Sequence, residues 1–287
     1  MSLSKTGFRE EPLVSIVIPS RNSSETIVRC LQSIENQSYQ NTEVVVVDNF
    51  SNDQTVEIVE GTGTKVLTAG PERSRQVNLG VIASSGKYVY RVDSDFIVGK
   101  EVVAECVESC EKRSLDGIAV HNTSDPTVSF WSRVRKFERD MHKRSPTNVA
   151  VRFVRRSVWQ ELGGLDETLI AGEDYDFHNR FIKQGHRFGF VDAEEIHLGE
   201  PKNLAEVVRK HYSYGKTILR YAKKDLPVAF VSLSPIRAGY LLNRRNLVDP
   251  EMIAGLCVYQ LVRYVSATAG IFATLTDWDQ KPREGKK

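Results

Sequence analysis

Short runs of β-branched residues alternate with segments of helical periodicity along the first 120 residues. The runs at 14–18 (VSIVI), 44–47 (VVVV) and 88–92 (YVYRV) are typical of strands covered on both faces. The segments 25–36 and 74–84, which lie between them, have the patterns of helices. Strands separated by helices form βαβ units with right-handed crossovers. The sequence therefore predicts an α/β fold with a mostly parallel, Rossmann-like central sheet flanked by helices.

The composition indicates a globular chain. Of the 287 residues, 40% are hydrophobic and 26% are charged, and the formal net charge of +2 argues against a general nucleic-acid binder. The four cysteines show no CxxC spacing, so we expect no disulfide scaffold and a reducing compartment. No leader-like pattern opens the chain, and no stretch of 18 residues is apolar and uncharged. We therefore expect a cytoplasmic protein without an ordinary membrane span.

Polar clusters follow three of the predicted strands. They are Ser20–Arg21–Asn22, Asp48–Asn49 and Asp93–Ser94–Asp95. Ligands of open parallel sheets bind outside the carboxyl ends of the strands. The clusters are therefore the first candidates for a functional site.

Asp93 and Asp95 are separated by one residue just past a buried strand. Carboxylates in this arrangement suit Mg²⁺ or Mn²⁺, which in turn bridges phosphate oxygens. The alternative is a solvated loop, and the two other polar strand ends favour the metal-binding interpretation.

Asp48 closes the second buried run. A carboxylate at this position commonly hydrogen-bonds the ribose or base of a nucleotide, whereas the alternative is a helix N-cap, for which Asp53 is the better candidate. Arg21 and Arg75 are candidate neighbours of a phosphate, with a solvated surface position as the alternative for each.

A second acidic cluster lies far along the chain at 172–176 (GEDYD). Acids at the start of a helix are ordinary capping and dipole chemistry. Three acids within four residues nevertheless repel one another unless a cation, a basic group or a substrate proton shares the site. A carboxylate here is therefore also a candidate general base.

His197 follows a strand-like stretch at 187–191, and a satisfied structural histidine is the alternative to a functional one. The histidines show no HExxH spacing, and no GxSxG, GxxxxGK[ST] or GxGxxG motif is present. These absences argue against a zinc protease, a serine hydrolase, a P-loop enzyme and a dehydrogenase.

The chain after residue 200 combines basic and apolar segments. Basic residues and tyrosines interleave at 202–224, and the apolar stretch 252–275 is interrupted by Arg263. Together with the basic segment 131–156, these helices would suit an anionic membrane surface and a lipid-linked acceptor. The alternative is a helical extension that packs on the rest of the chain or forms a homodimer.

Four segments resemble the family 2 glycosyltransferases, which are inverting enzymes with a GT-A fold. The first resembles the family's opening unit of strand, proline and helix, and the second resembles its nucleotide-contacting strand. The third resembles the strand that leads into a DxD motif, and the fourth resembles the block with the acidic base and a later histidine. In the same order they are PLVSIVIPSRNSSETIVRCLQSIENQSY, EVVVVDNFSNDQT, GKYVYRVDSDF and VWQELGGLDETLIAGEDYDFHNRFIKQGHRFGFVDAEEIHL. The resemblance covers roughly residues 12–200. It implies a GT-A domain there, after a tail at 1–11 and before a C-terminal helical extension at 201–287.

The resemblance implies that the donor, a UDP- or GDP-linked sugar, binds at the strand ends. Asp48 would hold the base or ribose, and Asp93 would contact the sugar and ribose side. The other residues counted with this donor site are Pro19, Ser20, Arg21, Asn22, Asn49, Arg75 and Ser94.

The resemblance also implies the chemical roles. Asp95 would bind Mn²⁺ or Mg²⁺, and His197 would reach the metal or the diphosphate. Asp174 would take the acceptor proton, with Glu173 as the second candidate. The acceptor would be a hydroxyl or a phosphate on a sugar, a growing glycan or a lipid-linked carrier.

One segment departs from the family pattern. Relatives usually have Ala-Arg-Asn-x-Gly after the third strand, whereas this chain reads SRQVNLG at 74–80, with Arg75 and Asn78 moved apart.

Two other functions are alternatives to a glycosyltransferase. One is a nucleotidyltransferase, which usually needs a glycine-rich loop after the first strand, and residues 20–25 contain no glycine. The other is a non-catalytic sugar-nucleotide binder.

Overall fold

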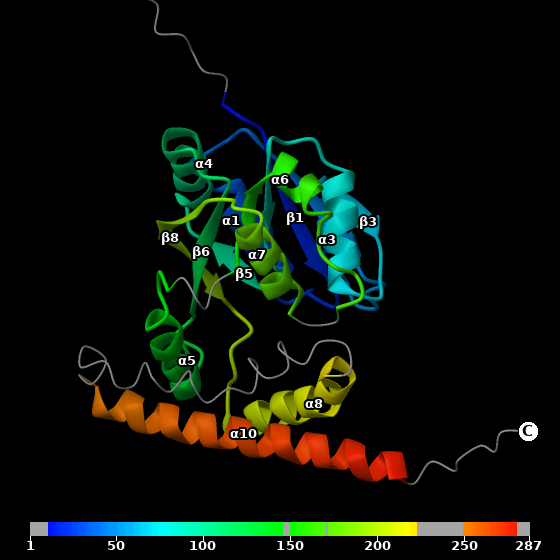
Figure 1. Cartoon of the computed structure of the whole chain (residues 1–287), viewed down its shortest axis with the longest axis vertical. Coiled ribbons are helices and arrows are strands. Elements are labelled where there is room, and N and C mark those ends of the chain that lie inside the picture. The colour runs from blue at the N-terminus through cyan, green and yellow to red at the C-terminus, as the bar shows by residue number, and fades with distance from the viewer. Residues whose placement is uncertain (1–10, 146–149, 170–171, 223–248, 280–287) are drawn as a thin grey trace, which may run out of the picture. The chain divides into compact units, whose positions relative to one another are not determined.

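The computed structural model describes residues 11–145, 150–169, 172–222 and 249–279 (Figure 1). The strands are β1 (Val14–Ser20), β2 (Thr42–Asp48), β3 (Lys65–Thr68), β4 (Tyr88–Arg91), β5 (Phe96–Val98), β6 (Gly117–Ser124), β7 (Phe153–Arg155) and β8 (Phe188–His197). The helices are α1 (Ile27–Glu35), α2 (Thr55–Gly61), α3 (Arg73–Ile82), α4 (Val102–Arg113), α5 (Phe130–Asp140), α6 (Arg156–Glu161), α7 (Glu173–Lys183), α8 (Leu204–Ala222) and α10 (Pro250–Asp279).

The strands form one sheet in the order β3-β2-β1-β4-β7-β6-β8-β5. The pairs β1–β2, β2–β3 and β1–β4 are parallel, and β7 runs antiparallel to both β4 and β6. The predicted α/β fold with a mostly parallel sheet flanked by helices is confirmed.

The register of the parallel strands brings their carboxyl ends together. Ser20 pairs with Asp48, and Val17 pairs with Arg91, so the chain leaves β4 beside the ends of β1 and β2. The polar clusters at these strand ends consequently lie at one edge of the sheet, as the βαβ pattern predicts.

The core lies on both faces of the sheet because successive strand side chains point to opposite sides. Ile16 and Ile18 of β1 pack in a cluster with α1 and α4, while Val17 packs in a second cluster with α3, α6 and α7. Gly80 of α3 permits this second contact, since a Cβ atom there would lie 2.3 Å from Val17 Cγ1.

Two elements differ from their predicted bounds. The first strand is expected at 14–18, yet β1 continues through Pro19 to Ser20. The missing N–H of Pro19 costs no ladder bond to β4, because β4 pairs with β1 only as far as Val17. His197 is the last residue of β8, whereas the sequence placed it after a shorter strand.

The contacts of the chain divide it into two compact units. The first comprises Met1–His121 and Pro146–Glu195, and the second comprises Asn122–Ser145 and Ile196–Lys287. Helix α5 thus groups with the C-terminal helices, because its Val134 packs with Leu256 and Tyr259 of α10. The expected domain bounds at 12–200 and 201–287 stay a prediction.

Helix α10 bears on the expectation of no ordinary membrane span. Its segment Pro250–Leu275 is long and apolar enough to cross a membrane by length and composition, with a mean hydropathy of 1.3. The sequence criterion was a stretch without any charge, and it did not select this segment because Arg263 interrupts it. The absence of an ordinary span stays a prediction. Along one side α10 packs closely on α8, where a Cβ atom at Gly270 would lie 2.1 Å from Tyr212 O.

Candidate active site

Asp48 joins the loops that follow β1 and β2. Its carboxylate accepts hydrogen bonds from Ser20 Oγ at 3.0 Å, from Ser51 N at 2.7 Å and from Ser51 Oγ at 2.6 Å. Asn22 N donates to Ser51 Oγ at 2.8 Å. The predicted residues Ser20, Asn22 and Asp48 therefore share one hydrogen-bonded turn at the edge of the sheet.

Gln76 of α3 fixes the ends of the same two strands, a role the sequence did not reveal. Its buried side chain donates to Ser20 O at 2.9 Å and also to Val47 O. Asn49 N donates to Ser20 O at 2.9 Å, and Asn49 Nδ2 donates to Pro71 O at 2.7 Å. These bonds hold the backbone at the carboxyl ends of β1 and β2.

The Asp93–Ser94–Asp95 turn follows β4 and contacts the first loop and α1. Ser94 Oγ lies 2.8 Å from Ser23 Oγ, and Cys30 Sγ lies 3.7 Å from Asp93 O. Burial, and then the charges of Asp95 and Asp93, raise the pKa of the Cys30 thiol to about 12. Cys30 is therefore a neutral thiol near the carboxylates of Asp93 and Asp95, and it is no nucleophile at neutral pH.

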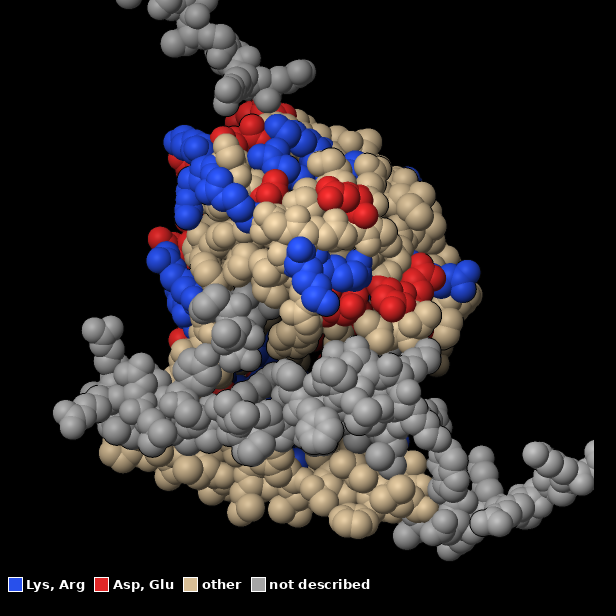
Figure 2. All heavy atoms as spheres, viewed as in Figure 1, with Lys and Arg blue, Asp and Glu red and all other residues tan. Residues whose placement is uncertain are grey.

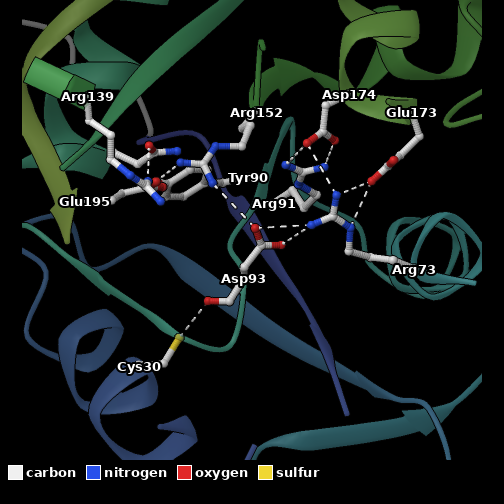
Figure 3. A network of polar contacts seen from close by, with 11 residues as sticks. Cys30, Arg73, Tyr90, Arg91, Asp93, Arg139, Arg152, Glu173, Asp174 and Glu195 are labelled. Carbon is white, nitrogen blue, oxygen red and sulfur yellow. Dashed lines mark hydrogen bonds and ion pairs between the residues drawn. The ribbon is translucent and has the colours of Figure 1, made fainter. Parts of the chain in front are cut away.

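Glu173 and Asp174 open α7, directly after Gly172 in the left-handed region. Arg91, which ends β4 and is 5% exposed, forms a two-pronged ion pair with Asp174, with Nη2 2.9 Å from Oδ2 (Figure 3). Burial lowers the pKa of Arg91 to about 10, which leaves it charged at neutral pH. Planar pairing of this kind fixes the orientation of the carboxylate as well as its position.

Arg73, on the first turn of α3, connects three carboxylates (Figure 3). Its Nε donates to Glu173 Oε1 at 2.9 Å, its Nη1 lies 3.4 Å from Asp93 Oδ1, and its Nη2 lies 3.5 Å from Asp174 Oδ2. The acids after β4 and the acids of α7, about 80 positions apart in the sequence, thus belong to one network.

Arg152, which directly precedes β7, extends the network to a buried carboxylate. It forms an ion pair with Glu195, which is 0% exposed and also accepts a hydrogen bond from Tyr90 Oη. Arg152 Nη1 lies 3.9 Å from Asp93 Oδ2, and its guanidinium group stacks 5.0 Å from the centre of the Phe96 ring. The guanidinium group of Arg152 is therefore held beside Asp93 by the core of the sheet.

The model of glycosyl transferase family 2 matches residues 15–161, which is more than half of the chain. The chain belongs to this family. Among curated proteins it is similar to the glycosyltransferase AglE of Haloferax volcanii, with 27% identity over 222 residues, 71% of this chain and 72% of AglE. The protein is a glycosyltransferase, and the resemblance drawn from its sequence is confirmed.

Solved structures support the same fold for this glycosyltransferase. The mannosyltransferase PcManGT from Pyrobaculum calidifontis, in complex with GDP-Man and Mn²⁺, superposes with a TM-score of 0.60 at 18% identity, covering 95% of this chain and 89% of that one. Residues 1–349 of S. aureus TarS in complex with UDP superpose with a TM-score of 0.54 at 18% identity, covering 96% and 94%. The GT-A fold is confirmed.

The remaining predicted residues of the glycosyltransferase lie in different surroundings. Pro19 is buried within β1, whereas Arg21 and Arg75 are exposed to solvent. Asn78 of the departing segment binds the chain before α7, donating to Leu165 O at 2.9 Å and accepting from Leu165 N at 3.0 Å. At its altered position after the third strand, Asn78 therefore makes a structural contact.

His197 belongs to the second compact unit and contacts a buried carboxylate there. Its Nδ1 lies 2.7 Å from Glu200 Oε1, and Arg139 Nη2 lies 3.1 Å from the same oxygen. Although burial acts to raise the pKa of Glu200, the hydrogen bond with His197 and the Arg139 and Arg135 charges lower it to about 2. The metal-binding role of His197 stays a prediction.

The carboxylates of the turn between β4 and β5 fit a cation whose other ligands are substrate phosphates. Within the described part of the chain, no group of three His, Cys, Asp or Glu side chains is placed to hold a metal by itself. Mg²⁺ in transferases is usually held by one or two carboxylates together with substrate phosphates. Asp95, half-buried between β4 and β5 and two residues after Asp93, is that kind of ligand.

Proposed function

We propose that this glycosyltransferase moves a sugar from a nucleotide-diphospho-sugar to an acceptor hydroxyl with inversion at the anomeric carbon. The observation that carries the proposal is the network in which Arg73 connects Asp93, Glu173 and Asp174. Acids that contact a donor sugar and acids that take an acceptor proton must lie around one reaction centre. The mannosyltransferase structure with GDP-Man supports this class of donor.

The nucleotide would bind at the ends of β1 and β2. Asp48, Ser20 and Asn22 are already ordered there by hydrogen bonds, so a nucleotide would meet a prearranged turn. Prearranged polar groups lose little conformational entropy when a ligand binds. Pro19, Arg21, Asn49, Arg75 and Ser94 are proposed with them as the surroundings of the donor.

Asp174 is the better general base of the two acids that open α7. Its side chain is 22% exposed, whereas that of Glu173 is 2% exposed and held by Arg73. A base must reach the proton that it removes, and the nearly fully buried carboxylate of Glu173 has no such access, whereas that of Asp174 is partly open to solvent although Arg91 binds it. We assign Glu173 to holding Arg73.

The transfer is a single displacement. The acceptor oxygen attacks the anomeric carbon as the bond from that carbon to the diphosphate oxygen breaks, and the acceptor proton passes to Asp174. A Mg²⁺ or Mn²⁺ ion held by Asp95, with His197 as a second predicted ligand, would stabilise the negative charge of the leaving nucleoside diphosphate. Attack from the face opposite the leaving group inverts the configuration.

Titration calorimetry with UDP- and GDP-sugars, with Mn²⁺ and with a chelator in its place, tests the donor and the metal. We expect one nucleotide-sugar to bind, with an affinity at least about tenfold weaker in chelator because the diphosphate then meets uncompensated carboxylates. Released nucleoside diphosphate in a donor panel checks turnover. Binding without any turnover would favour a non-catalytic binder, and production of pyrophosphate from a nucleoside triphosphate and a sugar phosphate would favour a nucleotidyltransferase.

The outer face of α10 supports a peripheral position on an anionic membrane, and with it a lipid-linked acceptor. Large apolar side chains are exposed along this helix, and Figure 2 shows a band of uncharged side chains there. They are Val258, Leu261, Val265, Phe272 and Leu275. Four basic residues against one acidic residue at 202–216, on and just before the neighbouring α8, provide a complementary charge.

The contacts of α10 favour a helix that lies in the membrane surface over one that spans the membrane. Its opposite side carries polar partners along much of its length: Gln260 Nε2 donates to Glu138 Oε1 at 2.9 Å, and Thr274 Oγ1 donates to Lys216 O at 3.3 Å. A spanning α10 would draw Glu138 and Lys216 into hydrocarbon, which is costly for charged groups.

Flotation with phosphatidylcholine vesicles, with and without phosphatidylglycerol, tests this placement. We expect the protein to float with the anionic vesicles at low salt and to be released by salt, because basic residues supply part of the binding. Leu261→Glu should abolish flotation, whereas Ile82→Glu, a matched change of an exposed apolar residue on α3, should not. No flotation of the wild type, or a dimer that Leu261→Glu dissociates, would contradict the proposal.

A further inference from the structure

Arg73 differs from the other arginines of the network in its exposure. Its side chain is 43% exposed, whereas those of Arg91 and Arg152 are each 5% exposed. Two of its three carboxylate contacts, to Asp93 and Asp174, are long at 3.4 and 3.5 Å. Exchanging one ion-pair partner of an exposed arginine for another costs little free energy, because water solvates the guanidinium group during the exchange.

Arg91 is the opposite case. It is enclosed by the core, and its two-pronged pair with Asp174 holds a charge that is costly to leave without a partner. Arg91 therefore stays with Asp174 in every state of the site, while Arg73 can exchange its two long contacts and still hold Glu173.

Arg73 is also the exposed cation beside Asp93. Of the two arginines whose contacts with Asp93 the structure gives, Arg152 is 5% exposed and Arg73 is 43% exposed (Figure 3). A diphosphate that approaches Asp93 would therefore meet the guanidinium group of Arg73. Guanidinium groups bind phosphate oxygens in the same two-pronged way as carboxylates.

We propose that Arg73 senses the donor. In the donor-free protein it holds Asp93, Glu173 and Asp174 together; when the nucleotide-sugar binds, it keeps Glu173 through Nε and exchanges its long contacts with Asp93 and Asp174 for the donor diphosphate. This inference rests on the proposed donor class. Once Arg73 turns, Asp174 is held by Arg91 alone and faces the acceptor with one positive neighbour fewer. Loss of a neighbouring positive charge makes a carboxylate a stronger base. Donor binding thereby prepares the base.

The first test compares binding of nucleoside diphosphate and nucleoside monophosphate to Arg73→Gln. We expect the affinity for UDP or GDP, whichever the wild type binds, to fall roughly 10- to 100-fold, as for loss of a charge-assisted hydrogen bond. The affinity for the corresponding monophosphate should change less than the affinity for the diphosphate. Arg113→Gln, the same change at an exposed position at the end of α4, is the matched control and should bind as the wild type does.

The second test separates this role from a structural one, because Arg73→Gln leaves the buried Glu173 without its arginine. The double variant Arg73→Gln with Glu173→Gln removes that buried charge, so it should regain thermal stability while diphosphate binding stays weak. Arg73→Lys keeps the charge without the planar fork and should restore part of the affinity. In kinetics, Arg73→Gln should raise KM for the donor by a larger factor than it lowers kcat.

The outcomes distinguish the inference from the proposed function. Unchanged UDP or GDP affinity in a folded Arg73→Gln variant, or an equal loss for mono- and diphosphate, would overturn the donor-sensing role alone. Failure of the wild type to bind any nucleoside diphosphate, with or without Mn²⁺, would overturn the proposed donor class and the inference with it.

Discussion

Replacing Asp174 by asparagine is expected to lower kcat for sugar transfer by at least about 100-fold, the lower end of what a positioned general base contributes. The amide cannot take the acceptor proton, yet it has nearly the shape of the carboxylate. Its oxygen still accepts a hydrogen bond from Arg91, so the pair keeps part of its geometry. Donor affinity, measured by titration with the nucleotide-sugar, should change little. Initial-rate kinetics with saturating donor measure the effect on kcat.

Glu173→Gln is the matched control for Asp174→Asn, because it makes the same chemical change one residue earlier on the same helix. We expect it to weaken donor binding through Arg73 and to leave most of kcat. Near-normal turnover of Asp174→Asn would contradict the assignment of the base. If Glu173→Gln were the variant that lost turnover, the base would be Glu173.

Replacing Glu195 by alanine is expected to lower the free energy of unfolding by about 3 kcal/mol, in the range for removing one partner of a buried ion pair. Arg152 would keep a buried charge with the carboxylate of Asp93 at 3.9 Å, which is beyond hydrogen-bonding distance. Tyr90 Oη would also lose the carboxylate that accepts its hydrogen bond. Urea unfolding, with circular dichroism as the readout, measures the change.

Two further variants locate the cause of that loss. Glu195→Gln keeps an acceptor for Tyr90 but removes the charge, so it should cost less than alanine does. The double variant Arg152→Met with Glu195→Leu removes both charges and should recover most of the stability, because apolar pairs often replace buried ion pairs without loss. A Glu195→Ala variant as stable as the wild type would show that Arg152 is solvated and that the pair contributes nothing.

The sequence predicted the parallel strands and the polar residues at their ends. Continuous apolar runs identify buried strands, and an aspartate after such a run is visible by position alone, as at Asp48 and Asp93. The register of the strands then places these residues at one edge of the sheet. This part of the candidate site could be predicted because the parallel direction of the strands follows from the βαβ pattern, and the carboxyl ends of parallel strands lie at one edge of the sheet.

The arginines of the site were missed. Arg91 carried a signal, since it is the charged residue inside the otherwise apolar run 88–92, and a charge in a buried strand needs a partner. Arg73 and Arg152 carried no such signal, because arginines at helix starts and before strands are common on surfaces. The sequence pointed instead to Arg21 and Arg75, both of which are exposed.

By itself the sequence determined the family, the class of fold and the candidate acids, because these depend on local pattern and on the order of segments along the chain. Only the tertiary structure decided that Asp93 and Asp174 share Arg73, and that Arg91 is the enclosed partner of Asp174. Contacts of this kind join residues far apart in the sequence, and they depend on side-chain packing that no periodicity encodes. The physical reason is that a charge is stabilised by what surrounds it in space, and those surroundings form only when α3, α7 and β4 come together.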